Sequence, residues 1–333
     1  MGLQRGIITV IAASYHDRVN VLQGASVAIS SPFDRAEWFA LLADSGIEPI
    51  VALAEGEDAV AAMALTRANG RLEPLRNWYS FTWRQLAPEG ERGDALLAAL
   101  ARDLKQQSHR VTLWPVPDED GSATRLEHAF RSAGWQVNRE QCDHNHVLPV
   151  NNRNFAEYWA SRPGKMRTTL KRKAKKVDVQ LLTHFDAQAW ADYETIYAQS
   201  WKPEEGDPAL LRRFAEEEGA AGRIRLAIAH HEGRAVAAQF WTVEAGCAFI
   251  HKLAHLEETK HLSAGTTLSA ALFEHVIDKD RVALVDFGTG NDGYKADWME
   301  EVRPRFRIDC LDPRQPRAWL PLAKRLAERV TQR

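Results

Sequence analysis

Cysteine is scarce in this 333-residue chain, and its three copies are scattered at Cys142, Cys247 and Cys310. They form no CxxC pair, and no histidine cluster at metal-ligand spacing accompanies them, so neither a disulfide framework nor a metal site is expected. Long apolar runs are missing as well: Ile7–Ser14 is far too short to cross a bilayer and lacks a signal-peptide cleavage pattern. We therefore expect a cytoplasmic protein with no membrane span and no metal.

A strong net charge is also absent. The chain has 43 Lys and Arg against 45 Asp and Glu, for a net charge of −2, which excludes a globally basic nucleic-acid binder but allows local basic patches. What is present is an ordinary globular composition, with 45% apolar residues. This length is typical of about two domains, each able to bury its own core.

The order of the expected elements occurs twice. In the first half, a hairpin over 49–66 is followed by a helix over 94–107 and a strand over 110–114. In the second half, a hairpin over 224–243 and a strand over 247–253 precede a helix over 265–277 and a strand over 281–285. Three short matches keep this order: AVAA at 59–62 and 235–238, AAL at 98–100 and 270–272, and RVxL at 110–113 and 281–284. We therefore predict an α/β protein with mixed sheets that contains two copies of one unit.

The helix of the second copy begins at a turn of small residues, SAGTT, directly after a strand. The unpaired N–H groups of a helix N-terminus bind anions, and phosphate is the natural candidate. Lys260 and His261 precede this helix, and no carboxylate lies between Glu258 and Glu274. Carboxylates crowd the corresponding helix start of the first copy. Like-charge repulsion therefore predicts that the second copy carries the ligand and that the first is degenerate.

A basic segment, residues 162–176, lies between the two copies and holds eight Lys or Arg residues and no acid. One interpretation is a solvated helix face. The other is a groove wall that binds a phosphate-bearing or polyanionic substrate, with Arg172 and Lys173 as candidates. Aromatic residues are not interleaved with the charges, which makes a sequence-specific nucleic-acid reader the weaker interpretation.

These features together resemble a known family. The motifs on which the resemblance rests are Leu253-Ala254-His255 at the end of a strand, SAGTT at the start of a helix, and DFG at 286–288 followed by Tyr294-Lys295 and Trp298. This order resembles the GNAT superfamily of acyl-CoA-dependent transferases. The basic segment and Ser200-Trp201-Lys202 are similar to the double-GNAT branch, which includes CelD-like acetyltransferases and Fem-type aminoacyl transferases. The resemblance implies two tandem GNAT-like domains, with a degenerate copy at 1–150 and the acyl-donor site in 151–333.

The resemblance also implies how acetyl-CoA, or another acyl-CoA, would bind as co-substrate. The strand 249–255 would pair with the pantetheine arm and present an N–H group to the thioester carbonyl. The pyrophosphate would bind at the following helix start. The usual loop Q/RxxGxG/A is reduced to SAGTT, so aminoacyl-tRNA, the donor of Fem-type members, stays an alternative. The residues assigned to the donor on this basis are Leu253, Ala254, Ser263, Gly265, Thr266 and Thr267.

Attack of an amine on a thioester needs a proton acceptor and stabilisation of negative charge. The candidate acceptors are His251, His255, Asp286 and Asp292, and His255 is favoured because histidine titrates near neutral pH. The alternative role of the histidines is groove wall, and that of Asp286 is turn former. Tyr294 and Lys295 are expected near the donor, although Lys295 would alternatively form an ion pair with Asp292. His251 is four residues from His255 on one strand, so both are expected to face the same side. The candidate substrate-binding residues are Arg172, Lys173, Trp201, His251 and Asp292.

The leading hypothesis is an acyltransferase that moves an acyl group, acetyl above all, to an amine or hydroxyl of a small polar or sugar-type acceptor. Aminoacyl transfer from tRNA to a cell-envelope precursor is the alternative within enzymes, and the basic segment suits it. A third hypothesis is a non-catalytic module that recognises an acyl carrier or an anionic polymer. The sequence names neither the acceptor nor the oligomeric state.

Overall fold

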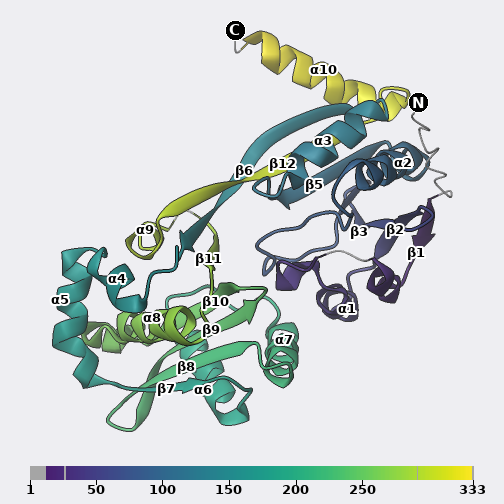
Figure 1. The fold of residues 1–333 in the computed structure, drawn as a ribbon. Coiled ribbons are helices and arrows are strands. Elements are labelled where there is room, and N and C mark those ends of the chain that lie inside the picture. The colour runs from purple at the N-terminus through teal and green to yellow at the C-terminus, as the bar shows by residue number, and fades with distance from the viewer. Residues whose placement is uncertain (1–12, 26–27, 291, 332–333) are drawn as a thin grey trace, which may run out of the picture. The chain divides into compact units, whose positions relative to one another are not determined.

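The computed structural model describes residues 13–25, 28–290 and 292–331, and most of the apolar run Ile7–Ser14 lies outside them. The chain divides into two compact units (Figure 1). Unit 1 comprises Met1–Asp143 together with Pro304–Arg333, and unit 2 comprises His144–Arg303. This division differs from an expected boundary at residue 150, because the C-terminal 30 residues lie in unit 1 rather than with the second copy.

Unit 1 is built on a mixed sheet with strand order β1-β2-β3-β4-β5-β12. Its first strands form an antiparallel meander, whereas β4 and β5 are parallel. Helix α2 packs on this sheet with one apolar face, since Leu97, Leu100 and Leu104 recur at helical spacing and are fully buried. The elements of unit 1 are β1 (Ser14–His16), α1 (Ala36–Asp44), β2 (Ile50–Glu55), β3 (Val60–Ala68), β4 (Arg71–Pro74), α2 (Glu91–Gln107), β5 (Arg110–Val116), α3 (Ser122–Ser132), most of β12 (Glu301–Leu311) and α10 (Pro316–Thr331).

Unit 2 has the same plan, with strand order β6-β11-β10-β9-β8-β7. Strands β7 to β10 are antiparallel neighbours, and β10 and β11 are parallel. Its elements are the end of β6 (Gln136–Pro149), α4 (Phe155–Ala160), α5 (Gly164–Lys173), β7 (Asp178–Leu182), α6 (Ala187–Ala198), α7 (Pro208–Ala220), β8 (Ile224–His231), β9 (Arg234–Glu244), β10 (Cys247–His255), α8 (Ala264–Glu274), β11 (Leu284–Thr289) and α9 (Lys295–Trp298).

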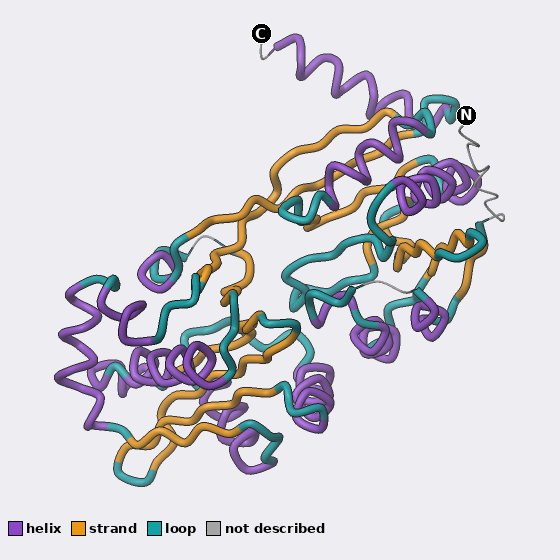
Figure 2. Tube along the Cα trace, in the orientation of Figure 1, coloured by secondary structure: helices purple, strands orange, loops and turns teal. Residues whose placement is uncertain are grey.

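Helices cover both faces of the unit 2 sheet (Figure 2). Successive residues of β9 point to opposite faces. Trp241 packs edge-on against Phe273 of α8, with ring centroids 5.1 Å apart. Phe240 packs against Trp190 of α6 at 5.3 Å and Phe214 of α7 at 5.8 Å. The sheet therefore separates an α8 face from an α6 and α7 face, and β9 is buried on both of them from Val236 to Thr242.

The predicted duplication is present in the topology, and the mixed α/β class is confirmed. In each unit an antiparallel meander leads to a helix and then to a parallel strand: β2-β3-β4, α2 and β5 in unit 1, and β8-β9-β10, α8 and β11 in unit 2. The long strand that follows each copy pairs in the other unit. β6 pairs with β11 over Asn145–Pro149, and β12 pairs with β5 over Phe306–Leu311. This exchange is why the C-terminal residues belong to unit 1.

The strand expected over 281–285 begins later than predicted, at Leu284. Arg281 has a left-handed backbone (φ 53°) and Ala283 donates its N–H to the Gly246 carbonyl, so these residues form the connection instead. A β-branched residue at position 282 is too weak a signal to mark the start of a strand. Among the helices that the structure describes, none is long and apolar enough to cross a membrane.

Candidate active site

The start of α8 is open for an anion. Ser263 adopts a left-handed backbone (φ 55°) and its side chain does not cap the helix. The Thr267 N–H donates a hydrogen bond to the Ser263 carbonyl at 3.2 Å, and this is the first hydrogen bond of the helix. The N–H groups of Ala264, Gly265 and Thr266 therefore precede the helical ladder, where the partial positive charge of the helix concentrates. The predicted donor residues Ser263, Gly265, Thr266 and Thr267 are thus brought together at one helix end.

A cation lies at this helix start. Lys173, the last residue of α5, donates a hydrogen bond from Nζ to Ser263 Oγ at 3.0 Å. Arg172 is exposed beside it, and α5 buries none of its residues. The helix dipole and the Lys173 ammonium thus favour negative charge at the same point. Not all of the basic segment contributes, because Arg162 is buried and bound to Glu300 and to the Trp298 carbonyl.

The corresponding helix start in unit 1 is closed. Glu91 and Asp94 lie in the first turn of α2, and Arg125 forms an ion pair with Asp94 at 2.7 Å. A Cβ atom at Gly93 would lie 1.8 Å from the Pro88 carbonyl oxygen, so the preceding chain packs directly on this turn. The contrast in charge that the sequence predicted is accompanied by a difference in space.

Strands β10 and β11 pair only at their beginnings. The parallel register runs from Cys247 opposite Leu284 to Phe249 opposite Asp286, while β10 stays paired with β9 as far as His255. Leu253 and Ala254 therefore lie on the later part of β10. One edge of this part pairs with β9, and among the described residues its other edge has no pairing with β11. An edge of this kind offers backbone groups to an extended ligand.

His255 ends β10 beside the start of α8. Its ring lies 4.2 Å from that of Trp201, and a Cβ atom at Gly265 would be 3.8 Å from its Nδ1. Burial lowers the pKa of His255 below its ordinary value, and the cations Lys260 and Lys202 act in the same direction against Glu257. The imidazole is therefore neutral at neutral pH and is able to accept a proton.

His251 does not face the same side as His255. The β9–β10 register shifts between Ile250 and Lys252, so a bulge at His251 breaks the alternation on which the expectation rested. The His251 ring packs 5.0 Å from Phe240 on the α6 and α7 face, and its Nε2 is 2.8 Å from Thr242 Oγ1. A bulge carries no sequence signal here, and it places His251 in a packed aromatic environment rather than beside the helix start.

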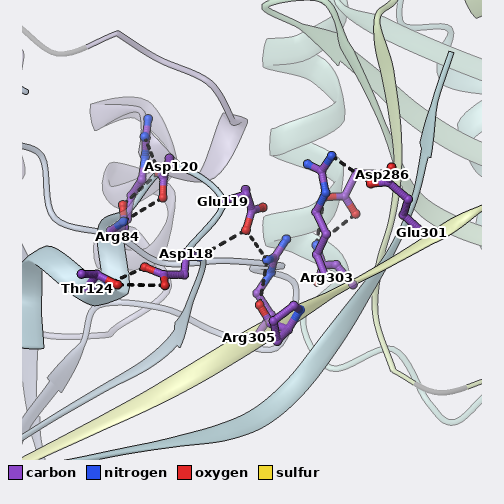
Figure 3. Close-up of polar contacts among 12 residues, drawn as sticks. Arg84, Asp118, Glu119, Asp120, Thr124, Asp286, Glu301, Arg303 and Arg305 are labelled. Carbon is purple, nitrogen blue, oxygen red and sulfur yellow. Dashed lines mark hydrogen bonds and ion pairs between the residues drawn. The ribbon is translucent and has the colours of Figure 1, made fainter. Parts of the chain in front are cut away.

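Asp286 is held by several donors. Asn145 Nδ2 lies 3.1 and 2.9 Å from its two carboxylate oxygens, and the Gly288 N–H donates to it at 2.7 Å. Figure 3 shows Arg303 close to Asp286 and Glu301. These contacts fix the position of the carboxylate between β6 and the turn at Gly288. The geometry therefore favours a role for Asp286 in shaping the loop after β11.

Lys295 and its neighbours form a second charged group at this loop. Lys295 is 5% exposed, donates to the Thr289 carbonyl at 2.5 Å, and lies 5.4 Å from the centre of the Phe287 ring. Asp292 is exposed, and its carbonyl accepts the Lys295 N–H at 2.9 Å. Tyr294 packs edge-on against Phe287 at 5.6 Å, and burial raises its pKa to about 12. Tyr294 therefore keeps its proton, and its hydroxyl is able to donate a hydrogen bond.

Three features of this region were not found from the sequence. Asn145 and His146 are 0% and 5% exposed on β6, and Asn145 is the residue that holds Asp286. Burial lowers the pKa of His146, and Lys295 adds to this effect. Lys252 on β10 forms a largely buried ion pair with Glu205 at 2.8 Å. The run DHNH at 143–146 offered a signal in its clustered polar residues, but it lay in the first copy, which was expected to be degenerate.

A cavity of about 510 Å³ lies between α6, the following loop and the start of α7. Trp190, Tyr193 and Tyr197 form an aromatic wall, and Glu205 brings its ion pair with Lys252 to the lining. Lys202 also lines it and is a sequence neighbour of Trp201, which contacts His255. Among the described residues no group of three or more His, Cys, Asp or Glu is arranged to hold a metal ion.

Comparison with known proteins places this site in a family. Residues 164–296 match the model of the acetyltransferase (GNAT) domain. The matched segment runs from α5 through the α8 helix start to the loop that holds Lys295. This part of the chain therefore matches a GNAT domain, and the resemblance to the GNAT superfamily is confirmed. No curated protein matches the sequence.

Solved structures share the fold of the whole chain. FemX has a TM-score of 0.64 at 9% identity, with 91% of this chain and 98% of that chain covered. A conserved protein of unknown function from Bacteroides thetaiotaomicron has a TM-score of 0.60 at 13% identity, covering 92% and 100%. L-PGS from Bacillus licheniformis has a TM-score of 0.54 at 13% identity, covering 90% and 98%. This chain therefore shares its fold with FemX and L-PGS over nearly the whole length of each.

Proposed function

We propose that this chain is an acyltransferase that moves an acetyl group from acetyl-CoA to an amine or hydroxyl of a small polar or sugar-type acceptor. The observation that carries the proposal is the start of α8, where an uncapped helix N-terminus and the Lys173 ammonium meet beside the open edge of β10. A donor with a pyrophosphate and an extended amide-bearing arm matches both features. The CelD-like character of the chain is part of this proposal.

The residues divide into roles along the path of the donor. Gly265 and Thr266 offer free N–H groups to the pyrophosphate, with Ser263, Thr267 and Lys173 at its edge. Leu253 and Ala254 pair with the pantetheine arm through their backbone. The acceptor attacks the thioester carbonyl directly, its proton passes to His255, and CoA leaves as the thiolate, to which the Tyr294 hydroxyl can donate a hydrogen bond. The carbonyl oxygen becomes negative in this step, and Lys295 is the cation nearest the loop after β11.

The test is calorimetric titration of the full chain with acetyl-CoA, desulfo-CoA and longer acyl-CoA analogues at two salt concentrations. We expect binding in the micromolar range that weakens in Lys173→Gln, because one of the charges that favour the anion is removed. Lys175→Gln removes an exposed charge from the same segment and serves as the matched control. Absence of binding to every CoA compound would exclude the proposed donor.

Aminoacyl transfer from tRNA is the second candidate, and the exposed cations of α5 favour it. Lys165, Arg167, Lys171 and Arg172 are all exposed on this helix, which leads directly to the α8 start. A polyanion that neutralises several of them would show a steep loss of affinity with salt, whereas a CoA would show a shallow one. Binding of charged tRNA with a steep salt slope, together with no CoA binding, would select this candidate.

A measurement of acyl transfer distinguishes an enzyme from a non-catalytic binding module. Release of the CoA thiol in the presence of amine and hydroxyl acceptors measures transfer directly. If CoA or tRNA binds and no acceptor supports thiol release or acyl transfer, and His255→Gln leaves binding unchanged, the site recognises its ligand without chemistry. In that case charge reversal at Arg172 and Lys173 should still abolish binding of the anionic partner.

A further inference from the structure

Helix α10 of unit 1 presents an apolar face to solvent. Trp319 is 59% exposed and Leu320 68% exposed, the highest values among the large apolar side chains that the structure describes. Ala323 and Ala327 are exposed as well and follow Leu320 at spacings of three and seven, so all of them share one side of the helix. Figure 1 shows α10 at the edge of unit 1. Contiguous exposed apolar side chains of this kind mark an interaction surface.

The opposite side of α10 is attached to unit 1. Ala318 is fully buried, and Arg325 forms an ion pair with Asp309 of β12. Trp319 Nε1 donates to the Pro313 carbonyl at 2.9 Å, which fixes the indole at the start of the helix. The helix is therefore anchored through one side while its other side, with Trp319 and Leu320, points away from the core.

The charge around this apolar face is mainly positive. Residues 313–331 include five basic side chains and one carboxylate, Glu328. Arg317 and Lys324 are exposed next to Leu320, and Arg314 is exposed while its guanidinium binds Asp312. The Asp312 carboxylate is fully buried, so it adds no negative charge to the surface beside the helix. An occupant of this surface must be apolar where it meets Trp319 and anionic around it.

A hollow behind α10 also combines apolar and basic side chains. It has a volume of about 560 Å³ and is lined by Trp135, Val137 and Leu322, with Arg131 and Arg325 among the other lining residues. Apolar walls and guanidinium groups thus occur on both sides of the helix. In the hollow, however, both guanidinium groups already pair with carboxylates, Arg131 with Glu127 and Arg325 with Asp309, so the solvent-facing side of α10 is the one that suits an anionic amphiphile.

We propose that α10 docks unit 1 on an anionic phospholipid surface, with Trp319 and Leu320 inserted between the head groups. A helix with an apolar face flanked by Lys and Arg lies in the plane of a membrane interface, and its 16 residues are too few for it to cross one. A second copy of this chain fits less well, because pairing of the same faces would bring together Arg317 and Lys324 from both copies. The surface lies outside the proposed acyl-donor site, so this inference does not depend on the transferase proposal.

The experiment is cosedimentation of the full chain with unilamellar vesicles. One set contains equal parts phosphatidylglycerol and phosphatidylcholine, and the other contains phosphatidylcholine alone. We expect binding to the anionic vesicles alone, weakened by added salt. The double variant Trp319→Ser/Leu320→Ser should weaken binding at least about tenfold through lost apolar insertion. Arg317→Gln/Lys324→Gln should weaken it by about tenfold or more, since each cation near an anionic surface contributes a several-fold factor.

Trp78→Ser is the matched control, because Trp78 is also in unit 1 and is 53% exposed but lies away from α10 in the sequence. It should leave vesicle binding unchanged, and unchanged circular-dichroism melting of each variant shows that the fold is intact. Failure to bind anionic vesicles, or full binding by the Trp319 and Leu320 double variant, would overturn the proposal. So would a concentration-dependent dimer in sedimentation equilibrium that the same double variant dissociates, because a second copy would then cover the face.

Discussion

A single side chain at the start of α8 tests the anion site. Gly265 has an ordinary helical backbone, and a Cβ atom added to it would lie 3.8 Å from His255 Nδ1, which is normal van der Waals contact. Gly265→Ala and Gly265→Asp are therefore both compatible with the fold. The two variants differ in charge, because the aspartate places a carboxylate where the phosphate should bind.

The expected size of the effect follows from Coulomb's law. Two negative charges about 5 Å apart repel by about 3 kcal/mol at an effective dielectric constant near 20. Gly265 is half-buried, so solvent and salt reduce this to about 1.5–2 kcal/mol, a loss of about 10- to 30-fold in affinity. The same carboxylate interacts favourably with the helix dipole by about 0.3–1 kcal/mol. Gly265→Asp should therefore weaken donor binding without lowering the stability of the protein.

Titration calorimetry with acetyl-CoA and thermal melting separate the two effects. We expect the parent and Gly265→Ala to bind alike, with the alanine variant melting at the same or a higher temperature because glycine disfavours a helix by up to about 1 kcal/mol. Gly265→Asp should bind weakly and melt like the parent. Equal affinity for acetyl-CoA in the aspartate variant would show that the phosphate does not bind at this helix start, and the reasoning from the dipole and Lys173 would be wrong.

Other residues give predictions with different readouts. His255→Gln should lower kcat about 10²- to 10⁴-fold with the donor affinity kept; because burial lowers the pKa of His255, the acid limb of kcat/KM in the parent should lie below pH 6.5, with activity lost as pH falls through it. An acid limb that persists in the variant would assign the proton to another group. Asp286→Ala leaves the buried Asn145 amide without its acceptor and should cost about 1–3 kcal/mol of unfolding free energy in urea titrations, whereas Asn145→Ala together with Asp286→Ala should cost less than the sum of the single changes. Additive effects would refute the pairing. Lys252→Met leaves Glu205 charged and largely buried, so unfolding should become easier by about 3–5 kcal/mol, and Lys252→Met/Glu205→Gln should recover part of that loss.

Most of the fold was predictable because its signals are local. The hairpins and strands of both copies follow from runs of apolar residues interrupted by turn residues, and α2 follows from leucines at helical spacing. The exchange of β6 and β12 was not predictable, since strand pairing across 135 or more residues is decided by which edge remains open. Nothing in residues 301–311 distinguishes a strand that completes its own copy from one that pairs with β5.

The site divides in the same way. The α8 start was predictable because it depends on the charges of consecutive residues, and the structure adds Lys173 from α5 at that point. The side that His251 faces was predicted wrongly because one bulged residue reverses the alternation of a strand. Asn145 was missed because its importance lies in a contact with Asp286, 141 residues away in the sequence.

The two copies together explain why one site is expected rather than two. Both units place a helix between the same strands, yet only the α8 start combines space with positive charge. In α2 the Pro88 carbonyl occupies the space beside Gly93, and the Asp94–Arg125 ion pair occupies the polar end of the turn. Removing carboxylates there by Glu91→Gln/Asp94→Asn would therefore free Arg125 without opening a phosphate site. Two substitutions would remove the negative charge at the start of α2, but they would not move the chain that packs on it before Gly93. We therefore expect that the first copy binds no phosphate and serves as a structural partner of the second.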